Sequence, residues 1–212
     1  MKNQNTLFFA SFAAFTSLTI SSLLFTPLAN AQFAGQNLQG RNFSNRRLER
    51  ASFRGANVTN ARFIRSILNN ASFHGATGPN ANFQNAELRN ASFYGATFGR
   101  RSRSRAANFQ SAVLIRADFY GANINGVNFR NADLRRARFH GTDARNVNFG
   151  NTDLQDITFY GANLRRANFR RANLRGVTFH GADMKRANLC GAVNIREARF
   201  IGSDLRGASC RP

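Results

Sequence analysis

Large apolar residues recur at every fifth position along most of this chain. Phe33, Leu38, Phe43 and Leu48 open the series, the residue two positions earlier is usually Ala, and the intervening residue is often Asn, Asp or Ser. A spacing of five matches neither the 3.6-residue period of an α-helix nor the two-residue period of a flat strand. The pattern therefore predicts a chain that turns a corner in each pentapeptide, with its large and small apolar residues pointing inward.

A second period, of 20 residues, appears when these residues are sorted by their place in a four-sided coil. The first and third sides then carry Phe in almost every coil, and the second and fourth carry mainly aliphatic residues. Coils stacked at the ~4.8 Å separation of neighbouring strands have a continuous core without a second layer. The predicted Phe core consists of Phe33, Phe43, Phe53, Phe63, Phe73, Phe83, Phe93, Phe109, Phe119, Phe129, Phe139, Phe149, Phe159, Phe169, Phe179 and Phe200.

Three interruptions of this strict period are informative. The step from Phe98 to Phe109 is eleven residues, which predicts an excursion loop at about 99–106. The loop holds four Arg side chains, which cannot enter a Phe-lined core and must lie in solvent. One extra residue near Ala192 predicts a bulge. Gly78, which replaces a large apolar residue and precedes a proline, predicts a local gap or kink on the second side.

The first 31 residues follow a different pattern. A single lysine precedes an apolar run over 7–25, a proline ends the run, and an Ala-Asn-Ala triplet follows it. This order is typical of a cleavable signal peptide, so we assign residues 1–31 to the signal peptide and residues 32–212 to the repeat. A membrane anchor is the alternative, because about 19 residues can just span a bilayer. Cleavage predicts export to a compartment in which disulfides persist.

Three units of the repeat are especially regular: Ala-Asn-Leu-Arg-Arg at 162–166, Ala-Asp-Leu-Arg-Arg at 132–136 and Ala-Asn-Leu-Arg-Gly at 172–176. They resemble the A-(D/N)-L-x-x motif of pentapeptide-repeat proteins, and the resemblance extends over nearly all of residues 32–212. It implies an all-β fold, a right-handed quadrilateral β-helix of about 8.5 coils of 20 residues, which forms a rod about 40 Å long.

Some pentapeptide-repeat proteins mimic DNA and act on gyrase through an acidic rod and a dimerising C-terminal helix. This chain is strongly basic and its sequence predicts no C-terminal helix, so we do not expect a gyrase-directed DNA mimic. Exported relatives occur in the periplasm and in the thylakoid lumen of photosynthetic bacteria. The expected location is therefore the periplasm, the thylakoid lumen or the extracellular space.

Cys190 and Cys210 fall on the third side of successive coils, which predicts backbones close enough for a disulfide. The period places Cys210 at an inward position and Cys190 at an outward one, so the bond requires the last coil to loosen. On the chain-entropy model a bond that closes such a loop stabilises by ~3 kcal/mol. Two free thiols are the alternative.

The charge of the chain lies outside this core. The sequence has 30 Lys and Arg against 10 Asp and Glu, a formal charge of +20, but 42% hydrophobic residues are too many for a disordered polycation. An outward basic column on the second side consists of Arg145, Arg165, Lys185 and Arg206, flanked by Arg166 and Arg186 and extended by Arg170, Arg171 and Arg175. Stacked like charges repel, so the column predicts an anionic partner. A surface that only keeps the protein soluble is the alternative, although Arg is better suited to bidentate binding of carboxylate or phosphate.

An aromatic column follows the first side and consists of His74, Tyr94, Tyr120, His140, Tyr160 and His180. His140 and His180 are two coils apart, about 9.6 Å, which is too far to chelate one metal ion. We interpret the column as a ladder of rings stacked on their neighbours. The alternative is a strip that binds planar ligands such as sugars or bases.

The sequence contains no recognisable catalytic, metal or cofactor site. Most Asp residues occupy the ordinary Asn or Asp position before an inward residue, and there is no phosphate-binding glycine loop. We therefore expect no enzyme activity, no cofactor and no small-molecule substrate. The leading hypothesis is an exported scaffold whose basic surface docks an acidic protein, a membrane surface or an anionic glycan. The alternative is sequence-independent nucleic-acid binding through the Arg columns and the Arg-rich loop.

Overall fold

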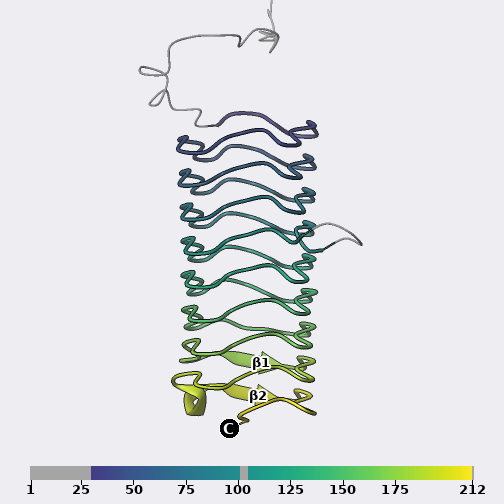
Figure 1. Ribbon diagram of the computed structural model, residues 1–212, viewed down its shortest axis with the longest axis vertical. Helices are drawn as coiled ribbons and strands as arrows, with labels where there is room; N and C mark the ends of the chain where they lie inside the picture. The colour runs from purple at the N-terminus through teal and green to yellow at the C-terminus, as the bar shows by residue number, and fades with distance from the viewer. Residues whose placement is uncertain (1–29, 101–104, 212) are drawn as a thin grey trace, which may run out of the picture.

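The backbone winds into a rod of stacked coils (Figure 1), as seen in the computed structural model, which describes residues 30–100 and 105–211. Parallel bridges connect residues 20 positions apart, such as Gln32 with Ser52 and Ser52 with Ser72. Each bridge is formed by the residue just before an inward residue, and a corner follows. The predicted all-β coil is therefore present, because a residue and its counterpart one coil later always lie side by side.

The named elements of the described chain are few, because most sides pair through a single residue. Strand β1, Thr178–His180, pairs in parallel with β2, Arg199–Ile201, with Phe179 opposite Phe200. The 3-10 helix η2 spans Ile195–Glu197. Within residues 30–100 and 105–211, no helix has the length and apolar character needed to cross a membrane. The predicted signal peptide lies outside the described residues, except for its last two positions.

The corners depend on left-handed backbone at the second residue after each inward position. Gly55, Asn60 and Arg65 hold φ angles of 63°, 59° and 54°. This conformation costs roughly 1–2 kcal/mol for a residue with a side chain. The left-handed conformation points the backbone N–H along the rod axis, toward the next coil. The Asn60 N–H therefore donates to Pro79 O at 3.1 Å, and the Arg65 N–H donates to Gln84 O at 3.0 Å. Inter-coil hydrogen bonds therefore offset the strain at each corner.

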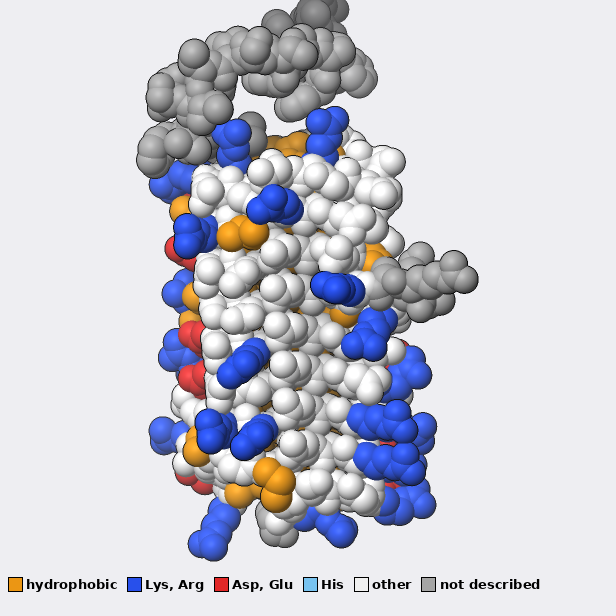
Figure 2. Space-filling model, in the orientation of Figure 1, with side chains coloured by type: hydrophobic (Ala, Val, Ile, Leu, Met, Phe, Trp, Pro, Cys, Tyr) orange, Lys and Arg blue, Asp and Glu red, His pale blue; other side chains and the backbone are white. Residues whose placement is uncertain are grey.

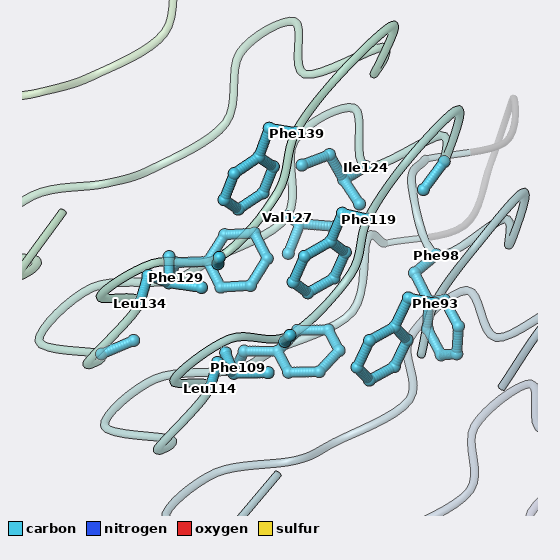
Figure 3. Close-up of a cluster of buried hydrophobic side chains, with 14 of the residues drawn as sticks. Phe93, Phe98, Phe109, Leu114, Phe119, Ile124, Val127, Phe129, Leu134 and Phe139 are labelled. Atoms are coloured by element: carbon cyan, nitrogen blue, oxygen red, sulfur yellow. The ribbon is translucent and has the colours of Figure 1, made fainter. Parts of the chain in front are cut away.

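The interior is a double stack of phenyl rings (Figure 3). Phe53 lies parallel to Phe73 with ring centroids 4.7 Å apart, and Phe63 lies parallel to Phe83 at 4.6 Å. Across the coil, Phe53 and Phe63 meet edge to face at 5.4 Å and 90°. Every Phe predicted to form the core packs there, with Phe43 and Phe200 half-buried and the others buried. The two Phe-bearing sides thus pack directly against each other.

The predicted gap or kink at Gly78 is wrong. Thr77 pairs with Thr97 as the repeat requires, and the Gly78 N–H donates to Thr97 O at 2.8 Å. The buried ring of Phe98, one coil later on the same side, occupies the space in which a Cβ of Gly78 would lie. A large residue thus fills the volume that its small neighbour leaves.

The predicted excursion loop leaves the rod at a corner, and residues 101–104 lie outside the described part of the chain. At its stem the Ala107 N–H donates to Phe98 O at 2.9 Å, and Asn82 pairs with Asn108. The bridges therefore resume in the same order, with the six surplus residues excluded from the coil.

The bulge predicted near Ala192 is also misplaced. Val193 still pairs with Asn173 at the usual spacing, whereas Thr178 pairs with Arg199, one residue farther along. The extra residue lies between these two bridges, in the segment that contains η2. A corner can lengthen without breaking the hydrogen bonds of a side, which explains why the extra residue lies there.

Candidate functional site

The basic column occupies one corner of successive coils. Bridges between Asp143 and Asn163, Asn163 and Asp183, and Asp183 and Asp204 align the second sides that carry it. Figure 2 shows Lys and Arg side chains gathered one above another at one edge of the C-terminal half, beside a face that is mostly uncharged. The four members, Arg145, Arg165, Lys185 and Arg206, therefore lie together as the sequence predicts.

Carboxylates of the same side neutralise much of this column, which the sequence analysis did not anticipate. Arg145 pairs with Asp143 at 2.7 Å, and Arg165 pairs with Asp183 at 2.6 Å. Asp204 accepts from both Lys185, at 3.0 Å, and Arg206, at 2.7 Å. We call these four cations with their three carboxylates the paired column. The expectation that only an external anion could relieve its repulsion is wrong, because the chain supplies its own anions.

The pairing shifts the pKa of three members of the column, Arg145, Asp204 and Arg206. Hydrogen bonds from Arg206 hold the pKa of the Asp204 carboxyl well below its ordinary value of 3.8. The hydrogen bond to Asp143 raises the pKa of the Arg145 guanidinium, and the hydrogen bond to Asp204 raises the pKa of Arg206. These directions favour the charged forms of Asp204, Arg145 and Arg206, which are the forms that make the ion pairs.

A signal for this pairing was present in the sequence. The units Asp-Ala-Arg at 143–145, Asp-Met-Lys at 183–185 and Asp-Leu-Arg at 204–206 place an acid two residues before a base. Residues two apart on an extended segment share a face. Both side chains therefore point outward around an inward residue, within reach of each other.

The flanking Arg residues divide into two groups. Arg175 pairs with Glu197 at 3.6 Å. Within the described chain, no carboxylate lies within 4.0 Å of the other four, which we call the unpaired set: Arg166, Arg170, Arg171 and Arg186. All four are exposed. The predicted basic surface is therefore two different surfaces, one neutralised from within and one open to external anions.

The unpaired set borders the third side of the rod, whose outward residues form a ladder of amides. Asn168 Nδ2 donates to Asn148 Oδ1 at 3.0 Å, and Asn148 Nδ2 donates to Asn128 Oδ1 at 3.2 Å. Arg166 and Arg186 occupy the corner before this side, and Arg170 and Arg171 occupy the corner after it. From Asn128 to Asn168 the outward residues of this third-side ladder are thus uncharged, and the unpaired set lies along both borders of this side.

The aromatic column is a continuous series of ring contacts. Three of its five steps are stacked: His74 to Tyr94 at 4.9 Å, Tyr94 to Tyr120 at 5.2 Å, and Tyr160 to His180 at 4.9 Å. The two steps that involve His140 are tilted by 50°. Neighbouring rings cover the faces that a planar ligand would need. This geometry favours the ladder interpretation over the binding strip.

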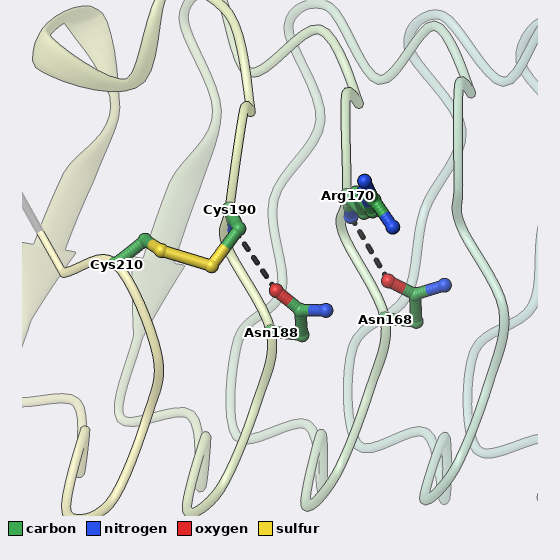
Figure 4. The surroundings of a disulfide bond; sticks show 5 residues. All are labelled: Asn168, Arg170, Asn188, Cys190 and Cys210. Carbon is green, nitrogen blue, oxygen red and sulfur yellow. Dashed lines mark hydrogen bonds between the residues drawn. A yellow bond between two sulfur atoms is a disulfide. The ribbon is translucent and has the colours of Figure 1, made fainter.

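Cys190 and Cys210 form a disulfide with their Cα atoms 4.9 Å apart (Figure 4). Asn188 pairs with Ser209, so the ladder places Cys210 opposite the buried Leu189 rather than opposite Cys190. Cys210 takes a left-handed φ of 53° and is exposed. The bond therefore runs diagonally, and the final coil departs from the repeat to make it.

Metal-ligating side chains do not converge anywhere in the described ranges. No group of three or more His, Cys, Asp or Glu side chains that could hold a metal ion occurs there. The concave features are shallow hollows between Arg side chains, such as one of about 350 Å³ between Arg145, Arg165, Arg166 and Arg186. Their linings offer hydrogen-bond donors and positive charge.

Sequence comparison finds two matching family models. The model described as a pentapeptide repeat region matches residues 112–189, and the model described as eight copies of the pentapeptide repeat matches residues 28–63, 47–77 and 66–100. No curated protein matches the chain.

Several solved structures are similar to this chain. HetL, a pentapeptide repeat protein involved in heterocyst differentiation regulation from the cyanobacterium Nostoc sp. strain PCC 7120, is 25% identical, with 87% of this chain and 85% of HetL covered and a TM-score of 0.33. QnrB1, a plasmid-mediated fluoroquinolone resistance protein, is 17% identical, with 84% and 88% covered and a TM-score of 0.42. A pentapeptide repeat protein from the Arabidopsis thaliana thylakoid lumen is 28% identical, with 68% and 71% covered and a TM-score of 0.27.

Proposed function

Because this chain belongs to the pentapeptide-repeat family, we propose that it is a non-enzymatic exported scaffold whose basic surface docks an anionic partner. In this proposal residues 1–31 are a signal peptide that is cleaved on export. The rod is right-handed with about 8.5 coils. The protein then acts in the periplasm, the thylakoid lumen or the extracellular space, where the partner is an acidic protein, a membrane surface or an anionic glycan.

The observation that carries the proposal is the unpaired set along the third side. Two like charges about 4 Å apart repel by about 1 kcal/mol in water, and more where the protein excludes solvent. Asp residues of the chain neutralise the paired column, but among residues 30–100 and 105–211 no carboxylate pairs with Arg166, Arg170, Arg171 or Arg186. An external anion that bound there would relieve this repulsion.

The side-chain chemistry also favours an anionic partner. Arg presents a rigid fork of donors that matches the oxygens of a carboxylate, sulfate or phosphate. The strip between the two borders carries a ladder of amide groups, which suits a surface contact better than a reaction. The proposed role is therefore recognition.

Binding of the mature chain to defined anionic probes tests the proposal. Changing all four residues of the unpaired set to Gln should weaken binding to anionic vesicles or to a sulfated glycan at least about tenfold at physiological salt. The matched control changes Arg145, Arg165, Lys185 and Arg206 to Gln, which removes the same charge from the paired column. Equal losses in the two variants would contradict the proposal, because net charge alone would then explain binding.

Double-stranded DNA serves as a further probe that separates the two candidate classes of partner. One outcome would favour sequence-independent nucleic-acid binding instead. In that outcome the logarithm of DNA affinity falls steeply with the logarithm of salt concentration, and the chain does not bind vesicles, glycan or acidic protein.

A further inference from the structure

A hollow on the third side interrupts a column of large side chains. The outward position after each inward residue carries Gln84, Gln110, Arg130, Gly150 and Arg170 in successive coils. Gly150 alone lacks a side chain, and a space of about 310 Å³ opens beside it between Arg130 and Arg170. By strand spacing these two Arg backbones lie about 9.6 Å apart. We call this hollow the Gly150 notch.

Neither backbone strain nor a steric clash explains why residue 150 is a glycine. Gly150 does not take a left-handed φ. A Cβ there would lie 3.1 Å from Asn148 Oδ1, a tight contact, but Gln110 and Arg130 carry side chains beside Asn108 and Asn128 in the equivalent place. The repeat therefore accepts a side chain here, and its absence creates the notch.

The walls of the notch carry uncompensated positive charge. Arg130 and Arg170 lie above and below it, and Arg171 lies beside it. None of the three makes an ion pair within the described chain, and no acidic residue lines the space. A single carboxylate would leave much of this charge unbalanced, whereas a phosphate group carries about −1.5 to −2 charges at pH 7.

The floor supplies polar donors without negative charge. Asn148 Oδ1 is already occupied, because it accepts from the Gly150 N–H and from Asn168 Nδ2, each at 3.0 Å. Each amide nitrogen has two hydrogens, and the ladder uses one hydrogen of Asn148 and one of Asn168. Asn168 Oδ1 is also occupied, because it accepts from the Arg170 N–H at 3.0 Å, so the remaining amide hydrogens are left for a ligand oxygen.

We infer that the Gly150 notch binds a dianionic tetrahedral oxyanion, a phosphate or sulfate group, between the guanidinium groups of Arg130, Arg170 and Arg171. This inference rests on the proposed docking function and narrows it to one recognised group. The group sits over Gly150 in place of a side chain, and the Asn ladder forms the floor beneath it.

Titration of the mature chain with inorganic phosphate, sulfate and acetate at constant ionic strength tests the inference. Phosphate and sulfate should bind at one site, with acetate at least about tenfold weaker. Phosphate affinity should rise as the pH is raised through neutrality, where inorganic phosphate loses its second proton, while sulfate affinity stays constant. Several equivalent weak sites, or equal affinity for acetate, would overturn the inference.

Three variants locate the site. Gly150→Gln fills the notch with a side chain that the same column already carries at Gln84 and Gln110, and should lower phosphate affinity at least about tenfold. Arg130→Gln should do the same by removing a wall, and remains informative if Gly150→Gln does not fold. Arg54→Gln removes an exposed Arg from the first side and should change the affinity less than about twofold. Unchanged phosphate binding in Arg130→Gln, or an equal loss in Arg54→Gln, would rule out the notch.

The same variants separate this inference from the proposed function. Loss of phosphate binding in Gly150→Gln supports the notch even when binding to vesicles and glycan persists through the unpaired set. Absence of phosphate binding in the wild-type chain, together with salt-sensitive binding to vesicles or glycan, overturns the notch and leaves the docking proposal standing.

Discussion

At the scale of single residues, Gly78 and Phe98 show how the core tolerates variation in size. Both stand at the inward position of the second side, one coil apart, and the ring of Phe98 lies where a Gly78 side chain would be. The volume of the core is therefore conserved over a pair of coils rather than within each coil. A substitution at either position should depend on the residue at the other.

A double-mutant cycle measures this dependence. Phe98→Ala should lower the free energy of unfolding by about 3–5 kcal/mol through the cavity it leaves. Gly78→Ala should lower it by about 1–3 kcal/mol through overpacking against the ring. In the Phe98→Ala background, Gly78→Ala should cost less, because the ring is gone and the remaining close neighbour of the new Cβ is Val58 Cγ2, at 2.8 Å. Additive changes in denaturant unfolding would show that the two residues do not share one space.

The sequence predicted which residues face the core but not which charged residues pair on the surface. The inward Phe residues were predictable because one period of five and one of 20 fix which positions face the core. The pairing of Asp143 with Arg145 was missed because Asp143 was assigned to the routine position before an inward residue. The two-residue period of an extended segment, applied within each side, would have predicted it.

At the scale of elements, corners absorb irregularity and sides do not. The surplus residues at 99–106 and the extra residue at η2 both fall in connections, and the bridges on either side of each remain in order. The periodicity located both interruptions to within a few residues. It could not assign the second to a corner, because counting residues does not show which hydrogen bonds persist.

The last coil depends on the disulfide between Cys190 and Cys210. Replacing both residues with Ser should remove up to ~3 kcal/mol of stabilisation on the chain-entropy model. In a solenoid each coil contacts only its neighbours, so the loss should remain local. Hydrogen exchange should accelerate for amides of 199–211 while those near Phe119 are unchanged. Uniform acceleration along the rod would show instead that the bond stabilises the whole solenoid.

At the scale of the whole molecule, the positive charge is distributed over a rod that neutralises it only in part. The sequence carries 30 basic and 10 acidic side chains. Self-repulsion of this excess opposes folding, and salt screens it over a distance that shrinks from about 30 Å at 0.01 M to about 8 Å at 0.15 M. Ion pairs such as Arg206 with Asp204 are weakened by the same salt, but most of the basic side chains of the described residues take no part in such a pair.

Stability should therefore increase when salt is raised over this range. The melting temperature of the mature chain should rise with sodium chloride, and the rise should be smaller after Arg166, Arg170, Arg171 and Arg186 are changed to Gln. The four-Gln variant of the paired column provides the control, because it removes the same charge but exposes three carboxylates. A melting temperature that falls with salt in the wild-type chain would show that its ion pairs outweigh its repulsion.

The stem of the loop at 99–106 has a consequence for engineering. The Ala107 N–H donates a hydrogen bond to Phe98 O at 2.9 Å, which closes the base of the loop. The coils before and after the loop stack as though the loop were absent. The rod can therefore carry a grafted peptide at this corner, such as an epitope or a protease-recognition segment, without a change in its neighbouring coils. Because coils are nearly equivalent, the same corner of other coils offers a series of display positions at fixed intervals of about 4.8 Å along the rod.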